Sequence, residues 1–544
     1  MPSTWPSSGT RSSPRSRRRS RPRSRPSPSP GRRLVWRPGG AEPRGWGVTR
    51  ATRIKDLRSR CPGPSRGEDG SMTGSGGHER AHTVVVGGGI SGLTTAYFLR
   101  QRLGPDAVLR VVEASDAPGG KIRTASIAGH PVDTGPDAFL SRAPELRRVV
   151  DALGLADLVV EPQSTGTFIW SRGRLRRLPP GTAFGLPERL WPLLRSGLLG
   201  PAAVARAGLD LVLPRTALPD DPSVADVVRP RFGAGVYDRL VVPLLGGVHA
   251  GDPALLSATS TVPEIAAMAR SGRSLYRTLR RRRRSAPPAT GRPSAPLVSL
   301  RGGLAALTDR LVEELGPDTV LTGTPARAIE RDENGGYTVR TDRGAFAARQ
   351  VVLATPAYVA AELVADLAPD AAALLREIGY VDVANVTLAF RRDQVPALPA
   401  GTGFLVPPVE DELVVGCSWL SQKWPQPADA GDYVLLKVMV GRSGDTRWLA
   451  MDDAELVRHV REALRRMLGV TADPVESLVQ RWPRAMPQYV VGHAARLAAL
   501  DTALAAAPGL LVTGAAYRGV GLAGCVAQAD ATATSLLATQ GAPT

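Results

Sequence analysis

The segment from residue 82 to residue 99, HTVVVGGGISGLTTAYFL, restricts the fold more than any other part of the chain. The β-branched run Val84–Val86 predicts a buried parallel strand, and apolar residues follow it at helical spacing. Between the two, Gly87, Gly89 and Gly92 form G-x-G-x-x-G. A strand, a tight glycine turn and a helix place backbone N–H groups at a positive helix N-terminus, which suits a pyrophosphate. In this context the motif favours dinucleotide binding over a plain turn.

Two later segments narrow the choice of dinucleotide. The apolar strand AVLRVVEAS (107–115) contains Glu113, whose carboxylate can accept ribose hydroxyls and would repel the 2′-phosphate of NADP. The next segment, APGGKIRTASIAGHPVDTGPDAF (117–139), brings Gly119–Lys121 close to a cofactor, and NAD dehydrogenases do not need it. It resembles the glycine-doublet segment of FAD enzymes, which Gly135–Asp137 would complete. A Gly/Pro-rich surface loop is the less favoured alternative.

The strong positive charge lies mainly outside the folded part of the chain. The formal net charge is +19, and residues 1–71 contain 18 Arg or Lys against four acids, which leaves +5 for residues 72–544. The Arg/Ser/Pro-rich stretch 11–33 cannot build a core. Residues 1–71 are therefore expected to be a disordered extension. It could be a nucleic-acid-binding arm, a transit peptide or a mis-set start; we favour the last, with Met72 as the expected functional start.

The cysteines and the lengths of the apolar runs indicate in which cellular compartment the protein is expected. Cys61, Cys417 and Cys525 have no spacing typical of a metal site or a disulfide framework, so a reducing cytoplasm is expected. No uninterrupted apolar run reaches 18 residues, so no transmembrane helix is expected. The apolar stretch 186–214 is interrupted by Arg and Pro. It is interpreted as buried core, and peripheral membrane contact is left open.

The remaining pattern predicts a discontinuous α/β protein, α+β overall. We expect a hairpin turning near Gly173, proline-punctuated helices to about 285, a solvated loop at Arg280–Arg284 and a helix over 302–315. Strand QVVLATP resumes the nucleotide fold, successive antiparallel strands occupy 383–440, and 508–538 forms a strand, a Gly-rich turn and a helix. The predicted FAD-binding, Rossmann-like domain comprises 82–150, 297–365 and 475–540. The predicted substrate domain comprises 151–296 and 366–474.

Six motifs together resemble one enzyme family. VVVGGGISGL, VVEASDAPGGKIRT, DTGPDAFLSR, VVPLLGGVHAGDP, RWPRAMPQYVVGH and GAAYRGVGLAGC are similar to segments of the oxygen-dependent protoporphyrinogen/coproporphyrinogen oxidase family. The resemblance covers about 82–540. It is strongest toward the bacterial branch that forms coproporphyrin, through GTGFLVP, CSWLSQKWP and RWPRAMPQYVVGH. The family has the amine-oxidase-like flavoprotein fold.

The resemblance implies an FAD enzyme of haem biosynthesis. It would oxidise coproporphyrinogen III to coproporphyrin III, removing six electrons over three flavin cycles, with O₂ as acceptor and H₂O₂ as product. Carried over residue by residue, it implies pyrophosphate, ribose and flavin contacts. These cofactor-binding residues are Gly87, Gly88, Gly89, Ile90, Ser91, Gly92, Glu113, Ala114, Gly120, Lys121, Gly135, Pro136, Asp137, Ala138, Ala326, Trp482, Val520, Gly521 and Leu522. The family usually has Ile-Pro where this chain has Leu522-Ala523, which affects the geometry of that turn more than the activity.

No catalytic side chain is assigned, because the chemistry would be centred on the flavin. The sequence contains no Ser/His/Asp set, no H-E-x-x-H and no predicted metal site. The substrate carries four propionates, so arginines should line one end of its cavity. Arg142 is the leading substrate-binding candidate, with Arg172 and Arg174 behind it. His249 and His493 are interpreted as structural histidines.

Three alternatives stay open at this point. The same fold could act on protoporphyrinogen IX, or as an amine oxidase or carotenoid desaturase. The non-enzyme alternative is a nucleic-acid-binding or scaffold protein that uses the Arg-rich arm. The favoured prediction has coproporphyrinogen III and O₂ as partners and no nucleic acid, in the cytoplasm.

Overall fold

The computed structural model describes residues 81–285, 295–425 and 431–540. All of them belong to one structural unit, Gly76–Thr544. The expectations for residues 1–71, Met72 and Cys61 lie outside the described residues, and so does the segment 286–294. The division into an FAD-binding and a substrate domain stays a prediction.

The first sheet is mostly parallel and is centred on β1 (Ala81–Val86). Its order is β12-β2-β1-β15-β14-β13, and β21 pairs with β15. β1 runs parallel to β2 (Leu109–Val112) and β15 (Gly344–Leu353), and its residues Val84–Val86 are fully buried. The other strands are β12 (Val320–Leu321), β13 (Ala326–Arg331), β14 (Tyr337–Thr341) and β21 (Leu510–Val512). Segments from both ends of the described chain therefore meet in one sheet.

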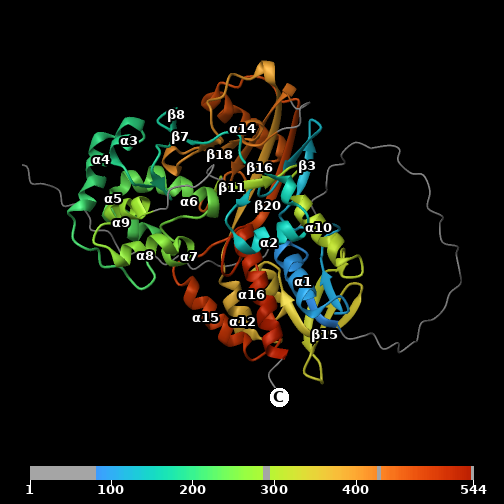
Figure 1. Ribbon diagram of the computed structural model, residues 1–544. Coiled ribbons are helices and arrows are strands. Elements are labelled where there is room, and N and C mark those ends of the chain that lie inside the picture. Colours follow the sequence, from blue (N-terminus) through green and yellow to red (C-terminus); the bar gives the residue numbers. More distant parts are fainter. Residues whose placement is uncertain (1–80, 286–294, 426–430, 541–544) are drawn as a thin grey trace, which may run out of the picture. The chain divides into compact units, whose positions relative to one another are not determined.

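Helices cover both faces of this sheet (Figure 1). One core joins α1 (Ile90–Leu103), α2 (Pro144–Ala152), α10 (Ala305–Leu315) and α16 (Leu522–Gln540). The other joins α11 (Ala357–Leu363), α12 (Pro369–Arg376) and α15 (His493–Leu504). The sheet is buried on both sides, as a parallel sheet requires.

The second sheet has the order β20-β16-β19-β18-β17-β7-β8 and is antiparallel except for the pair β17–β7. Its strands are β7 (Thr167–Ser171), β8 (Arg174–Arg177), β16 (Tyr380–Arg391), β17 (Gly403–Leu405), β18 (Val414–Trp419), β19 (Tyr433–Val440) and β20 (Glu476–Pro487). One face packs against α14 (Asp453–Leu468). The opposite face carries Asn385 and Lys437, because side chains alternate along each strand.

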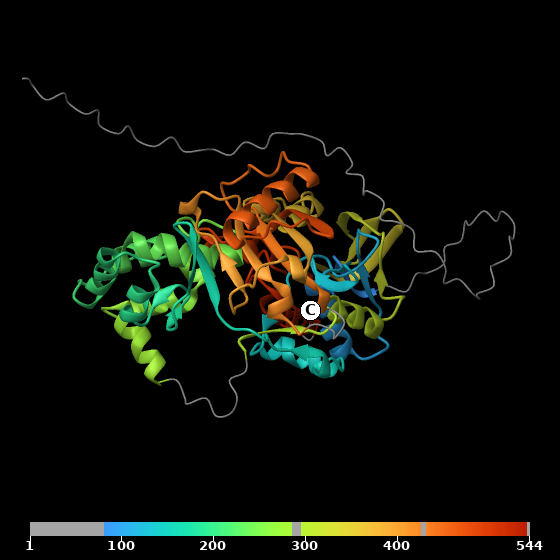
Figure 2. The same ribbon diagram turned by 90° about the horizontal axis from the view of Figure 1, so that it is seen from above.

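A helical lobe packs at the β7–β17 end of this sheet. It comprises α3 (Leu190–Ser196), α4 (Pro201–Gly208), α5 (Val224–Val236), a π-helical turn at Tyr237–Val241, α6 (Val242–His249), α7 (Ala258–Thr261), α8 (Pro263–Ser271) and α9 (Leu275–Ser285). Figures 1 and 2 show these helices gathered together in green. Ile169 and Leu405 of the sheet contribute to the lobe's core.

Short elements complete the described structure. The strands are β3 (Thr124–Ile127), β4 (His130–Asp133), β5 (Phe139–Leu140), β6 (Val159–Val160), β9 (Thr182–Ala183), β10 (Leu186–Pro187) and β11 (Leu297–Leu300). The helical turns are η1 (Ala156–Leu158), η2 (Leu209–Leu211), η4 (Arg392–Gln394), η5 (Pro408–Glu410) and α13 (Leu420–Lys423). Hairpin β3–β4 leads directly into the segment 133–138, which is central to the site below.

The sequence predictions for class and element type are confirmed, with one error. The α/β class, the turn at Gly173 and the strands within 383–440 are as expected. The predicted solvated loop at Arg280–Arg284 is wrong, because α9 continues through it to Ser285. Leu275, Tyr276 and Leu279 bury one face of that helix while the arginines remain exposed, and arginine is a good helix former.

The apolar stretch 186–214 is only partly core. Leu193 and Leu198 are completely buried, whereas Trp191 and Val212 are 66% and 72% exposed. None of the helices in the described ranges combines the length and the hydrophobicity that crossing a membrane requires.

Candidate functional site

The glycine turn between β1 and α1 leaves no room for side chains at two positions. A β-carbon on Gly92 would overlap the carbonyl oxygen of Gly87, and one on Gly87 would lie 2.9 Å from the carbonyl oxygen of Ala354. Gly87 also has a φ of +111°, which L-residues rarely adopt. Gly89 is the N-cap of α1 and has no side chain to satisfy the first N–H groups of the helix. The turn therefore presents bare backbone donors at a positive helix end, as an anion site does.

Glu113 is fixed beside this turn at the end of β2. Its Oε2 accepts a hydrogen bond from the Gly88 N–H at 2.7 Å, and its Oε1 accepts from Ser115 N–H and Oγ at 2.8 and 2.6 Å. Its carbonyl accepts from the Thr324 N–H, which brings Ala326, the first residue of β13, into this neighbourhood. Among the described residues Oε2 accepts only the hydrogen bond from Gly88 and keeps a lone pair for a further donor, such as a ribose hydroxyl.

The glycine doublet packs directly on the first turn. The Gly119 N–H donates to the Gly88 carbonyl at 2.8 Å, and a β-carbon on Gly120 would lie 3.2 Å from the Gly89 Cα. A β-carbon on Gly135 would overlap the Lys121 carbonyl oxygen. Backbone from three separate segments therefore comes together at distances that only glycine permits.

The start of α16 closes the site from the C-terminal side. A β-carbon on Gly514 would lie 3.7 Å from the Ser91 Oγ, so the segment before α16 lies against the start of α1. Burial raises the pKa of Cys525, while Ser91 and Lys121 act in the opposite direction. The turn Val520–Leu522, with Gly521 at a φ of +93°, opens this helix. Its N-terminus is the second one at the site.

Two buried hydroxyls at the site have no hydrogen-bond partner within the described part of the chain. They belong to Thr355, whose backbone N–H faces Gly87, and to Thr513, which directly precedes Gly514. Buried polar groups are normally paired, so unpaired hydroxyls suit a polar ligand at this place. They lie beside the closely packed glycines of the first turn and the doublet, which we call the glycine cradle. The glycine turn, Glu113, the doublet and the α16 turn together fit a dinucleotide.

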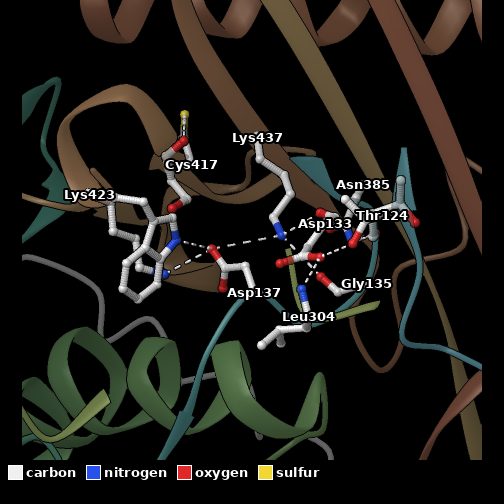
Figure 3. Close-up of polar contacts among 12 residues, drawn as sticks. Thr124, Asp133, Gly135, Asp137, Leu304, Asn385, Cys417, Lys423 and Lys437 are labelled. Atoms are coloured by element: carbon white, nitrogen blue, oxygen red, sulfur yellow. Dashed lines mark hydrogen bonds and ion pairs between the residues drawn. The ribbon is translucent and has the colours of Figure 1, made fainter. Parts of the chain in front are cut away.

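A second group of polar residues surrounds Asp137 (Figure 3). Lys423 Nζ donates to Asp137 Oδ2 at 2.9 Å, Trp424 Nε1 donates to the same oxygen at 3.4 Å, and Lys437 Nζ lies 3.9 Å from it. Burial alone would raise the pKa of Asp137, but the Lys437 and Lys423 ammonium groups outweigh burial and hold it far below its usual range. Asp137 is therefore a fixed anion at neutral pH.

Lys437 ties the second sheet to the segment that carries Asp137. Its Nζ donates to the carbonyl oxygens of Asp133 and Gly135, each at 3.0 Å, and burial lowers the pKa of this ammonium. Burial likewise raises the pKa of Asp133, whose Oδ1 accepts from Thr124 Oγ1 and the Leu304 N–H.

Trp482 and Asn385 reach the same segment from β20 and β16. Asn385 Nδ2 and Trp482 Nε1 both donate to the Thr134 carbonyl oxygen, at 2.7 and 3.2 Å. A β-carbon on Gly135 would lie 3.7 Å from the Trp482 ring. The pairing of β20 with β16 shifts register between Val381 and Val383, close to this point. Bulges of this kind often re-aim side chains next to active sites.

The structure brings most of the predicted cofactor residues together, but it leaves Arg142 apart. The positions from Gly87 to Gly92, Glu113, Gly120, Lys121, Gly135, Ala326, Trp482 and the start of α16 are linked by the contacts above. Arg142 is exposed and has no ion pair or hydrogen-bond partner among the described residues. Its role in substrate binding stays a prediction, as does that of Arg172 and Arg174, which are also exposed.

The two histidines have the environments of structural residues. His493 stacks on Tyr489 at 4.1 Å between ring centroids, and its Nε2 lies 2.8 Å from the Tyr517 carbonyl oxygen. His249 is buried, and burial lowers its pKa to about 4, so it is neutral at physiological pH.

Lys423 and Lys437 lie at the candidate site, although the sequence analysis assigned neither of them a role. The chain has only four lysines among 69 basic residues, and three of them, Lys121, Lys423 and Lys437, lie along the segment 133–138 or contact it. For Lys437 the sequence did contain a signal, because it is the single lysine in the apolar strand YVLLKVMV. A cation buried in such a strand needs polar partners, which indicates a buried polar site.

Comparisons with known proteins are consistent with this geometry. The family model for flavin-containing amine oxidoreductases matches residues 90–537. A coproporphyrinogen III oxidase from Mycobacterium bovis is 37% identical over 83% of this chain and 96% of its own length, and one from Bacillus subtilis is 32% identical over 84% and 98%. A chloroplastic protoporphyrinogen oxidase from Oryza sativa is 33% identical over 85% and 89%. The crystal structure of an Exiguobacterium protein assigned as a protoporphyrinogen oxidase has a TM-score of 0.75 at 32% identity, over 85% of this chain and 99% of its own.

Proposed function

Because the chain belongs to the flavin-containing amine oxidoreductases, and within them to the coproporphyrinogen III oxidases, we propose that it oxidises coproporphyrinogen III to coproporphyrin III. FAD is the cofactor of this reaction, and it would supply the two-electron oxidation in each of three cycles. We propose O₂ as the final acceptor and H₂O₂ as the product. The observation that carries the proposal is the glycine cradle with its unpaired hydroxyls, built beside a second sheet and a helical lobe.

The residues of the site divide into those that hold the cofactor and those that position the segment beside it. The N–H groups around Gly89 would bind the pyrophosphate, and Glu113 would accept the ribose hydroxyls. Trp482, Asn385 and Lys437 fix the backbone of the segment 133–138 by hydrogen bonds to its carbonyl oxygens. A site of this kind needs position and exclusion of water more than an acid–base residue.

The charge of the helical lobe supports a substrate with many carboxylates. Residues 190–285, from α3 to α9, contain 14 arginines and no lysine against seven acids, a formal net charge of +7. Over residues 72–544 the net charge is only +5, so the rest of that part is negative. A cationic lobe raises the local concentration of an anionic substrate. Coproporphyrinogen III carries four propionates and protoporphyrinogen IX carries two, so this field favours the former.

The test of the proposed function compares the two porphyrinogens on the purified full-length chain. The flavin spectrum reports bound FAD, porphyrin fluorescence reports turnover and a peroxide assay reports the acceptor. We expect a higher kcat/KM for coproporphyrinogen III. A preference for protoporphyrinogen IX would assign the chain to the alternative reaction, and porphyrin formation no faster than autoxidation would contradict both.

We also propose where the protein works and how its chain is divided. A cytoplasmic location is supported by the two free, buried thiols of Cys417 and Cys525. The exposed side chains of Trp191 and Val212 on the helical lobe support peripheral membrane contact. The two sheets support a division in which 82–150, 297–365 and 475–540 bind FAD and 151–296 and 366–474 bind substrate, although β20 pairs with the second sheet.

A further inference from the structure

The carboxylate of Asp137 uses only one of its two oxygens within the described structure. Lys423 and Trp424 donate to Oδ2, and Oδ2 is also the carboxylate oxygen nearer to the Lys437 ammonium. No hydrogen bond from any described residue reaches Oδ1. Figure 3 shows this second oxygen turned away from the two lysines. A carboxylate oxygen has lone pairs for about two donors, so Oδ1 is available to a ligand.

The Asp137 side chain is partly exposed, unlike that of Lys437. The Asp137 side chain keeps 18% of its surface exposed, whereas Lys437 behind it keeps 5%. Asp137 lies two residues after Gly135, on which a β-carbon would lie 3.7 Å from the Trp482 ring. Lys437 lies on the same face of the second sheet as Asn385. The free oxygen is therefore next to the segment along which the cofactor is proposed to lie.

The chemistry of the proposed substrate explains what such an oxygen could accept. A fixed anion repels propionates, so the groups that it attracts are the pyrrole N–H donors at the centre of a porphyrinogen. When a hydride leaves a meso carbon, the C–H bond breaks and both of its electrons leave with the hydride, for which bound FAD would supply the acceptor. The ring system is left with one positive charge, which a pyrrole N–H then discharges by losing its proton to solvent water. A preorganised anion beside that N–H stabilises the charge as it develops.

We propose that Asp137 is a catalytic residue whose Oδ1 accepts a pyrrole N–H and stabilises the cationic tetrapyrrole during each hydride transfer. This proposal rests on the proposed function. Lys423 and Lys437 are then positioning residues, because they hold the carboxylate in place by its other oxygen. They also keep it ionised, since they hold its pKa low. A carboxylate with so low a pKa is a poor proton acceptor, so it acts by its charge and the proton leaves to water.

The first test is Asp137→Asn in the holoenzyme. Asparagine keeps the size of the side chain and one oxygen for Lys423, but it removes the charge. We expect kcat on coproporphyrinogen III to fall about a hundredfold, as when one preorganised electrostatic group is removed from an active site. FAD content, measured from the flavin spectrum, should remain that of the wild type. Unchanged kcat with full flavin would overturn the proposal, and so would loss of FAD, which would make Asp137 a cofactor-binding residue.

The second test separates charge from structure with Lys423→Met, which removes one ammonium and leaves the carboxylate. Lys423, Lys437 and Asp133 are the charged groups that bear on Asp137. Losing Lys423 should raise the pKa of Asp137, so the acid limb of the kcat–pH profile should move to higher pH, and kcat above the limb should fall less than in Asp137→Asn because the charge remains while its positioning is loosened. If Lys423→Met lost as much kcat as Asp137→Asn at every pH, the contact between Lys423 and Asp137 would have only a structural role, and the proposal would be overturned.

The two proposals fail separately. A wild-type holoenzyme inactive on both porphyrinogens overturns both. Activity on protoporphyrinogen IX alone overturns the proposed substrate, and the Asp137→Asn comparison is then made on that compound. Full activity in Asp137→Asn with an active wild type overturns only the role of Asp137.

Discussion

Gly92 and Gly87 approach so closely at the start of α1 that a β-carbon on Gly92 would overlap the carbonyl oxygen of Gly87. Gly89, between them, is different, since its β-carbon would meet only the Gly120 Cα, at 3.9 Å. One turn therefore contains glycines required by packing and a glycine with space above it. This difference separates two predictions about the same motif.

Gly92→Ala should destabilise the fold itself. The overlap is with backbone, which cannot rotate away, so the loss should exceed about 3 kcal/mol, the upper end for ordinary overpacking. Chemical unfolding monitored by circular dichroism measures it. Gly200→Ala is the matched control, because nothing lies within 4 Å of its β-carbon and its φ is −71°. Equal stability of the two variants would contradict the packing argument.

Gly89→Asp should leave the fold largely intact but abolish FAD binding. The side chain has room, yet it places a negative charge at the helix end where the pyrophosphate would bind. The flavin spectrum of the purified variant and its unfolding curve give the two readouts. A stable variant with full flavin content would show that this turn does not bind the cofactor.

Salt should weaken catalysis on coproporphyrinogen III more than on protoporphyrinogen IX. The Debye length falls from about 30 Å at 0.01 M to about 8 Å at 0.15 M ionic strength, which screens the field of the lobe. The doubled substrate charge should make the slope of log kcat/KM against ionic strength roughly twice as steep. Steady-state kinetics over this range measure the slopes, and parallel slopes would exclude a role for the lobe's charge.

Arg142→Ala should raise KM for coproporphyrinogen III. A charge-assisted hydrogen bond to a carboxylate contributes roughly 1.5–3 kcal/mol, which corresponds to a roughly ten- to hundredfold change. Because the cofactor would stay in place, kcat should change less than KM. Arg147→Ala is the matched control, since Arg147 is an exposed arginine of α2 that pairs with Asp151. If both variants keep the wild-type KM, the propionates bind elsewhere.

Asp137 should stabilise the protein in a pH-dependent way. Its folded pKa is depressed below the ordinary value of 3.8, so its contribution is fully present above about pH 4 and is lost as the pH falls through the folded pKa. Asp137→Asn should therefore be less stable than the wild type at neutral pH, and the difference should shrink in acid. Urea unfolding at several pH values measures this difference, and subtraction removes the opposite effect of Asp133, whose pKa is raised. A difference that is constant with pH would mean that the lysine contacts do not depend on charge.

Local patterns predicted where the backbone segments of the candidate cofactor site approach one another closely. The Gly87–Gly92 turn and the α16 turn are recognisable from glycines next to a strand or a helix, because close backbone approach permits few other residues. Glu113 is recognisable from its place at the end of the second strand. Asp137 was predicted as a cofactor residue, which stays a prediction; the structure shows its side chain hydrogen-bonded to Lys423 and near Lys437.

The Asp137 cluster could not be read from local sequence, because it depends on long-range pairing. Asp137 and Lys423 are 286 residues apart, and only the packing of the second sheet on hairpin β3–β4 brings them together. The error at Arg280–Arg284 has a different cause. A run of arginines was interpreted by its charge, although the apolar residues before it already had helical spacing.

The last strand of the described chain, β21, pairs in parallel with β15, and α16 packs on α1 at the opposite end of the sequence. During synthesis the glycine turn therefore leaves the ribosome more than 400 residues before the segment that completes its surroundings. A nascent chain that stops before residue 510 has the edge of β15 unpaired and lacks the second helix N-terminus. We therefore expect stable flavin loading to follow synthesis of this segment, and a nonsense mutation that removes only the final thirty-five residues, 510–544, should yield an apoprotein.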